Sequence, residues 1–142
     1  MFPNEIFLSH ASKDTKFADA LARILRAHGL PVWFSRTNIR GAQQWHDEIG
    51  AALKRCDWFL VALSPHSVGS MWVKRELLFA LQQNHFENRI VPLLVQSCDH
   101  ERLSWTLSLS EFVDFTCSFD AGCRDLLRIW GIGLDPGAKP IA

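Results

Sequence analysis

Apolar residues gather in five short runs along the chain, and stretches with helical spacing separate these runs. The runs predict strands, because each is short, mainly apolar and bounded by polar or turn-forming positions. They are Glu5–Ser9, Leu30–Phe34, Asp57–Ser64, Arg89–Val95 and Glu111–Phe115. The third run is apolar almost throughout, which is typical of a central parallel strand covered on both faces. Pro92 in the fourth run predicts a bulge or a place away from the centre of the sheet.

Helical spacing predicts four helices between and after the strands. They cover Thr15–His28, Trp45–Arg55, Met71 to about Asn84, and Asp120–Ile132. Asp14 is expected to cap the first helix, which Gly29 then ends. The segment from 99 to 110, "DHERLSWTLSLS", predicts one or two irregular helical turns.

Strands and helices therefore alternate about five times along the chain. This alternation predicts an α/β fold with a parallel sheet and helices on both faces. For five strands we expect the flavodoxin-like order 2-1-3-4-5. A length of 142 residues fits one domain, which we place at residues 1–132. Residues 133–142, "GLDPGAKPIA", are rich in Gly and Pro and are expected to form a frayed tail or a linker.

Charge and cysteine usage exclude some classes of function. Fifteen Lys and Arg balance fifteen Asp and Glu, so we expect no nucleic-acid partner, and little charge opposes self-association. No apolar run approaches a membrane span, and the N-terminus does not resemble a signal peptide, so we expect a cytoplasmic protein without a membrane partner. The four Cys lack the spacing of a metal site, which predicts free thiols and no bound metal.

Polar side chains follow the first and third strands, which are neighbours in the expected strand order. Ser9 and His10 come at the end of the first strand, and Ser64 ends the third. Trp72 and Glu76 open the helix that follows. Ligands of open parallel sheets bind beyond the carboxyl ends of the strands, where the strand order reverses. These side chains are therefore expected to surround one crevice.

Trp72 and Glu76 are four residues apart on a predicted helix and should be neighbours on one face. An indole beside a carboxylate lowers the local dielectric and should raise the pKa of Glu76. The spacing alone leaves two interpretations open. The pair is either structural, with Glu76 favouring the helix dipole and Trp72 anchoring the core, or Glu76 is a catalytic carboxylate.

Three stretches carry a resemblance to a known family. They are "IFLSHASKD", "GLPVWFSRTNIRGAQQWHDEI" and "CDWFLVALSPHSVGSMWVKREL". In this order and spacing, the chain resembles a TIR domain over nearly its whole length. The resemblance is greatest to the bacterial and plant branch, because of "SP" and "S-x-W-x-x-x-E-L" after the third strand. It implies the flavodoxin-like sheet that the pattern also predicts.

The resemblance further implies an enzyme that uses NAD+ as its substrate and needs no cofactor. Many TIR domains break the bond between nicotinamide and ribose, giving nicotinamide and ADP-ribose or a cyclic isomer of it. The catalytic Glu of that family corresponds to Glu76, with Trp72 as its partner. Ser9 and His10 match positions that line the nicotinamide pocket, although an aromatic residue often stands in place of His10.

The resemblance also assigns a role to the segment Ser35 to Gln44, a loop that gates the site and joins neighbouring subunits in the family. Arg40, like Arg36, is a candidate for binding the pyrophosphate of NAD+. Ser35 stands where an acidic residue is usual, which is a departure from the family pattern.

Three functions stay open from the sequence. The first is an NAD+ nucleosidase, hydrolase or cyclase, that is active on self-assembly in antiphage defence or virulence signalling. The second is a non-catalytic scaffold or adaptor that acts through TIR–TIR contacts. The third is an unrelated flavodoxin-like binder of phosphate or flavin, which the absence of a Gly-rich loop after the first strand argues against.

Overall fold

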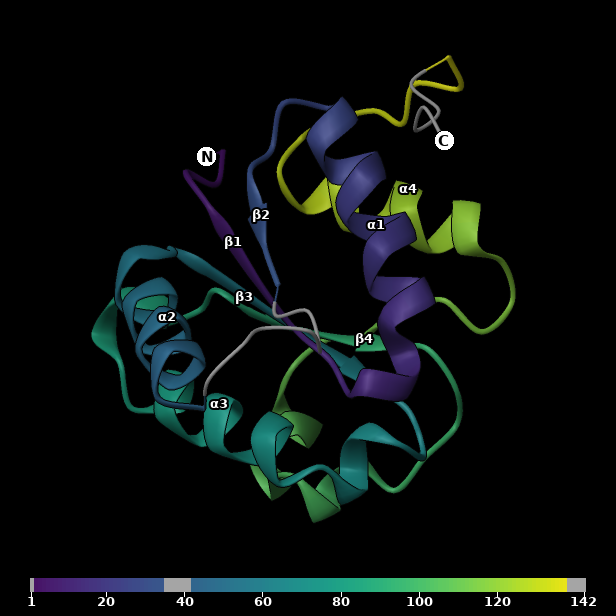
Figure 1. Ribbon diagram of the computed structural model, residues 1–142. Coiled ribbons are helices and arrows are strands. Elements are labelled where there is room, and N and C mark those ends of the chain that lie inside the picture. Colours follow the sequence, from purple (N-terminus) through teal and green to yellow (C-terminus); the bar gives the residue numbers. More distant parts are fainter. Residues whose placement is uncertain (1, 35–41, 138–142) are drawn as a thin grey trace.

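The five strands form one parallel sheet in the order β2-β1-β3-β4-β5, as the sequence predicts (Figure 1). The computed structural model describes residues 2–34 and 42–137, with residues 42–45 described through their backbone alone. The strands are β1 Ile6–Ser9, β2 Val32–Trp33, β3 Trp58–Leu63, β4 Ile90–Leu94 and β5 Val113–Asp114. Each is shorter than the apolar run that predicted it. The order places the switch point between β1 and β3.

The helices are α1 Thr15–Ala27, α2 Ala42–Arg55, α3 Met71–Leu81 and α4 Phe119–Ile129. Short 3-10 turns are η1 Ser12–Asp14, η2 Ser67–Gly69, η3 Asn84–Phe86, η4 His100–Arg102 and η5 Trp105–Leu109. The last two are the irregular turns expected between 99 and 110. The third helix ends earlier than predicted, because Gln83 adopts extended backbone angles and Phe86 enters the core from a separate turn.

Helices cover both faces of the sheet. Figure 1 shows α1 and α4 on one face and α2 and α3 on the other. Side chains alternate between the two faces along β1, as the pleat of a strand requires. Ile6 and Leu8 pack in the core beneath α1 and α4, whereas Phe7 packs in the core beneath α2 and α3. The same alternation turns the next residue, Ser9, toward α2 and α3.

Pro92 does not produce a bulge, because the pairing of β3 with β4 runs without a break through Val61 and Pro92. The other expectation is confirmed, since β4 lies one strand from the edge. The carbonyl of Leu94 accepts a hydrogen bond from Phe115, so Pro92, two residues earlier, also turns its nitrogen toward β5. The β4–β5 pairing begins only at Leu93, and the missing N–H therefore costs no ladder bond.

The segment after α4 is attached to the domain. Leu134 packs against the core beneath α1, and the backbone N–H of Asp135 donates to Nε2 of His28 at 3.0 Å. This part of the expected tail is held rather than frayed. The boundary at residue 132 stays a prediction.

Candidate functional site

A buried hydrogen bond joins the carboxyl end of β1 to α3. Ser9 Oγ donates to Glu76 Oε1 at 2.6 Å, and both side chains are almost completely removed from solvent. Ser9 faces α3 because of the alternation along β1. Glu76 lies on the inward face of its helix with Val73, Leu77 and Ala80. The sheet and the helix thus place a carboxyl group at the predicted switch point.

The two features named in the structural interpretation, a helix-dipole contact of Glu76 and a core position of Trp72, do not match the geometry of α3, and the catalytic role of Glu76 stays a prediction. Ser70 caps α3 by accepting a hydrogen bond from the N–H of Val73, and no acidic residue lies in the first turn, where the helix dipole acts. Trp72 is no core anchor, since 38% of it is exposed. Its ring lies 5.5 Å from the guanidinium carbon of Arg75.

Burial raises the pKa of Glu76 to about 7, and the hydrogen bond from Ser9 opposes this rise. The direction agrees with the sequence prediction, but the cause is burial of the whole carboxyl group rather than one indole wall. A carboxyl group with this pKa exchanges its proton near neutral pH, which is a property of many catalytic acids and bases.

An apolar pocket of about 250 Å³ lies beside Glu76, between α2 and α3. Its lining residues are His46, Ile49, Gly50, Leu53, Lys54, Trp72, Arg75, Glu76 and Phe79. Trp72 and Glu76 therefore share one pocket, as their spacing predicts. The sequence did not indicate Arg75 and Lys54. Arg75 could have been found from its place three residues after Trp72, whereas Lys54 joins the pocket only through the packing of α2 on α3.

His10 is buried next to Ser9. Its ring meets Phe34 edge-on at 5.7 Å between centroids, and burial lowers its pKa below the usual range. Within residues 2–34 and 42–137, the His10 Nδ1 atom has no hydrogen-bond partner. A neutral imidazole with an unpaired buried nitrogen can form a hydrogen bond with a ligand.

Ser64 belongs to a separate cluster and is completely buried. Its hydroxyl donates to Asp14 Oδ2 at 2.5 Å and accepts from the backbone N–H groups of His66 and Ser67. Asp14 does occupy the N-cap position of α1, but it makes no capping bond, so the predicted cap is wrong. Its carboxylate instead ties α1 to the turn after β3. In this arrangement the hydroxyl of Ser64 shapes the end of β3, and its place in the substrate site stays a prediction.

The remaining predicted site residue, Arg40, lies outside the described residues. The same holds for Arg36 and for residues 35–41 of the loop Ser35 to Gln44.

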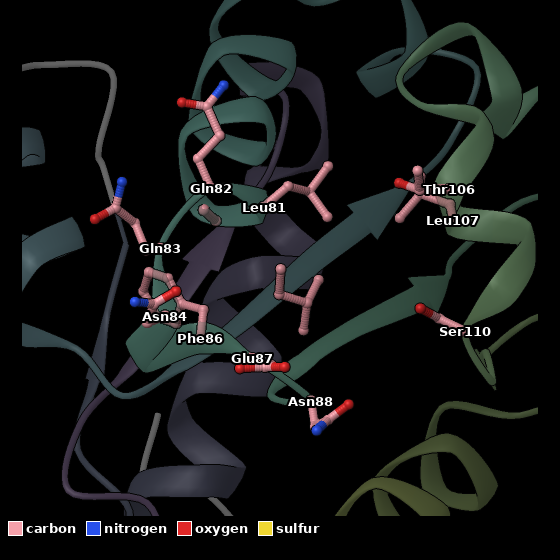
Figure 2. Close-up of a pocket in the computed structure, with 12 residues that line it drawn as sticks. Leu81, Gln82, Gln83, Asn84, Phe86, Glu87, Asn88, Thr106, Leu107 and Ser110 are labelled. Atoms are coloured by element: carbon pink, nitrogen blue, oxygen red, sulfur yellow. The ribbon is translucent and has the colours of Figure 1, made fainter.

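A second, larger pocket of about 430 Å³ lies at the other end of α3 (Figure 2). Amide side chains of Gln83, Asn84 and Asn88 and hydroxyls of Thr106 and Ser110 line it. It includes the first residue of β4 and so lies at the amino end of that strand, away from Ser9. None of the predicted site residues that the structure describes lines this second pocket.

Two features are absent from residues 2–34 and 42–137. In these parts of the chain no group of three His, Cys, Asp or Glu could hold a metal ion. No helix among them is long and apolar enough to cross a membrane.

Comparison with known proteins identifies relatives. PdTIR, an NAD(+) hydrolase from Paracoccus denitrificans (strain Pd 1222), is 32% identical over 133 residues, which is 89% of this chain and 44% of that protein. BtTIR, a 2' cyclic ADP-D-ribose synthase from Bacteroides thetaiotaomicron, is 27% identical over 110 residues, 75% of this chain and 38% of that protein. The chain thus spans less than half the length of these curated relatives.

Solved structures share the fold at lower identity. The TIR domain of the Toll-related receptor TRR-2 from Hydra magnipapillata superposes with a TM-score of 0.69 at 18% identity, over 87% of this chain and 95% of that one. The TIR domains of the activated Roq1 resistosome superpose with a TM-score of 0.68 at 18% identity, over 89% of this chain and 98% of that one. A family model described as TIR domain matches residues 6–127. With this match and the strand order 2-1-3-4-5, the chain belongs to the TIR domain family.

Proposed function

We propose that this chain is an NAD+ nucleosidase, a hydrolase or a cyclase, with Glu76 as its catalytic residue. The observation that carries the proposal is the buried Ser9–Glu76 pair at the switch point, with an apolar pocket beside the carboxyl group. The names of the two curated relatives, a hydrolase of NAD+ and a cyclic ADP-ribose synthase, support it.

The proposed reaction breaks the bond between N1 of nicotinamide and C1′ of the ribose. The electron pair of that bond leaves with nicotinamide, which becomes neutral, and positive charge develops on the ribosyl group. The ionised Glu76 carboxylate stabilises this charge in a dry site, where such an interaction is stronger than in water. Water then adds to C1′ and loses a proton. In the cyclising alternative the nucleophile comes from the same molecule, either the adenine or a ribose hydroxyl that loses its proton, and the product is a cyclic ADP-ribose.

Each neighbour of Glu76 has a role in this proposal. Ser9 orients the carboxyl group through its hydrogen bond. Trp72 supplies an aromatic wall for the substrate. His10 does not line this pocket and packs instead against Phe34, so its proposed contact with the nicotinamide end of the substrate rests on the family resemblance alone. Arg40 keeps its predicted role in binding the substrate, and no further cofactor or metal takes part.

The proposed setting is a cytoplasmic immune (antiphage) or virulence signal that is switched on by self-association. Four free cysteines support a reducing compartment, and the zero formal charge does little to keep copies apart. The segment Ser35 to Gln44 is the proposed contact between copies.

Chromatography of nicotinamide released from NAD+ tests the proposal. The purified protein should release it, more rapidly when concentrated on a resin, and Glu76→Gln should not. Mass analysis of the second product then separates hydrolysis from cyclisation. Release by the Glu76→Gln variant at the wild-type rate would remove Glu76 from the mechanism. If the wild type released no nicotinamide, either free in solution or on the resin, a non-catalytic scaffold acting through TIR–TIR contacts would be favoured.

A further inference from the structure

The pocket beside Glu76 carries two basic side chains that the proposed chemistry has not used. We infer that Arg75 and Lys54 bind the diphosphate of the dinucleotide substrate and so make the site selective for substrates that carry one. The inference rests on the proposed function and adds the residues that hold the anionic part of NAD+.

The two residues reach the pocket from different helices. Lys54 lies in the last turn of α2, and Arg75 lies in the second turn of α3. Both line the pocket beside Glu76, and both side chains are exposed. Between them the wall is apolar, formed by residues such as Leu53 and Phe79. A pocket of this composition fits a ligand with an apolar or aromatic part and an attached anion.

Neither cation is neutralised by a neighbour that the structure describes. Among the ion pairs formed by the described residues, none includes Arg75 or Lys54. Arg55, by contrast, is held by Glu5 through bonds of 2.6 and 3.0 Å. Of the described residues that line this pocket, Glu76 is the one carboxyl group, and it is buried. Two positive charges thus face at most one negative charge.

Arg75 is also held in a suitable orientation. Its guanidinium carbon lies 5.5 Å from the centre of the Trp72 ring. A guanidinium over an aromatic ring keeps its N–H donors free, and their planar arrangement matches two oxygens of a phosphate. Lys54 adds a second, more mobile ammonium group. Two cations suit the two negative charges of a diphosphate.

The position next to Glu76 matters because the diphosphate is attached to the reacting ribose. Arg75 directly precedes Glu76, and the helix turns the two side chains about 100° apart, one outward and one into the protein. A ribose at the carboxyl group and a diphosphate at Arg75 are therefore compatible with one bound molecule. Such anchoring far from the broken bond would add binding energy that is the same before and during the reaction.

Arg75→Gln and Lys54→Gln test the inference, because they keep most of the side-chain stem and remove the charge. Each should raise KM for NAD+ about tenfold, as expected for loss of one charge-assisted hydrogen bond, with kcat changed less than about twofold. Arg75→Lys should recover part of the loss. Nicotinamide riboside, which has no diphosphate, should show no change in KM. Lys74→Gln is the matched control, since Lys74 is exposed on α3 and does not line the pocket.

A direct binding measurement separates this inference from the proposed function. Calorimetric titration with ADP-ribose, which retains the diphosphate, requires no turnover. Binding that is weakened about tenfold by Arg75→Gln but not by Lys74→Gln would support the diphosphate site even if the wild type released no nicotinamide. Equal binding by both variants, no binding by the wild type, or an unchanged KM for NAD+ in an active enzyme would overturn it.

Discussion

Ser9 and Glu76 lie 67 positions apart in the chain and share a buried 2.6 Å hydrogen bond between strand β1 and helix α3. Burial raises the pKa of Glu76 to about 7, and the hydrogen bond from the Ser9 hydroxyl acts in the opposite direction. The ionisation of Glu76 therefore depends on how closely the helix packs on the strand and on one serine side chain.

The proposed chemistry requires an ionised Glu76, so activity should depend on pH. We expect log kcat/KM for NAD+ to rise with a slope of one up to about pH 7 and to level above it, because kcat/KM reports the pKa of the free enzyme. Nicotinamide release measured from pH 5 to about pH 9 checks this. A profile that falls across the same range would mean that the protonated form is the active one.

Ser9→Ala should move this profile to higher pH. The hydrogen bond from Ser9 stabilises the charged carboxylate, and its loss leaves burial unopposed, which raises the pKa of Glu76 further. The rate at pH 6 should fall more than the rate at pH 9. Ser9→Thr keeps the hydroxyl and is the control. An unchanged midpoint in Ser9→Ala would show that the hydrogen bond does not set the ionisation of Glu76.

Glu76→Gln should abolish turnover and yet stabilise the fold at alkaline pH. The pKa of Glu76 is raised on folding from 4.5 to about 7, so between these values the folded state binds more protons than the unfolded state. Stability of the wild type therefore falls as the pH rises through this window. At pH 8 the variant should be more stable by on the order of 3 kcal/mol, and below pH 4.5 the two should converge.

Denaturant unfolding of both proteins at several pH values measures that difference. Glu87→Gln is a suitable control, because Glu87 is an exposed carboxylate near the other end of α3. A stability difference that stays constant from pH 4 to pH 8 would contradict the linkage.

Ser64→Ala should destabilise the domain by about 1–3 kcal/mol, because it leaves the buried Asp14 carboxylate and two backbone N–H groups without their partner. The double variant with Asp14→Ala should lose less than the sum of the two single changes. Thermal or denaturant unfolding of the wild type, the two single variants and the double variant gives the coupling free energy between Ser64 and Asp14. Additive losses would mean that the two side chains do not stabilise each other.

Two helix glycines should respond to Ala in opposite directions. A Cβ at Gly122 of α4 would lie 2.3 Å from the Phe115 ring, which is packed against Phe17, so Gly122→Ala should cost about 1–3 kcal/mol. A Cβ at Gly50 of α2 meets nothing within 4 Å, and Gly50→Ala should stabilise the helix by up to about 1 kcal/mol. Comparing their unfolding midpoints checks both. Equal effects would show that Phe115 can move aside.

The layout of the fold was predictable because it depends on local patterns. Apolar runs and helical spacing indicate each strand and helix, and their alternation restricts the sheet to a few orders. Glu76 was singled out by the family resemblance, because its spacing from Trp72 alone left a structural interpretation open. Contacts between distant segments were less accessible: Asp14 has the residue type of a helix cap, but its carboxylate bonds to Ser64, 50 positions away. Lys54 becomes part of a pocket only when two helices pack together.

The alternation of side chains along β1 also limits how the gene for this domain can change. Inserting one residue between Leu8 and Ser9 would shift the residues that follow it to the opposite face of the strand, so that Ser9 would point beneath α1 and α4. The Glu76 carboxyl group would then face a residue other than Ser9 and would lose its hydroxyl partner. A domain that tolerated the insertion by repacking would have lost the hydrogen bond between Ser9 and Glu76. The register of strand β1, Ile6–Ser9, is thus constrained by the Ser9–Glu76 contact as well as by the packing of the two core faces.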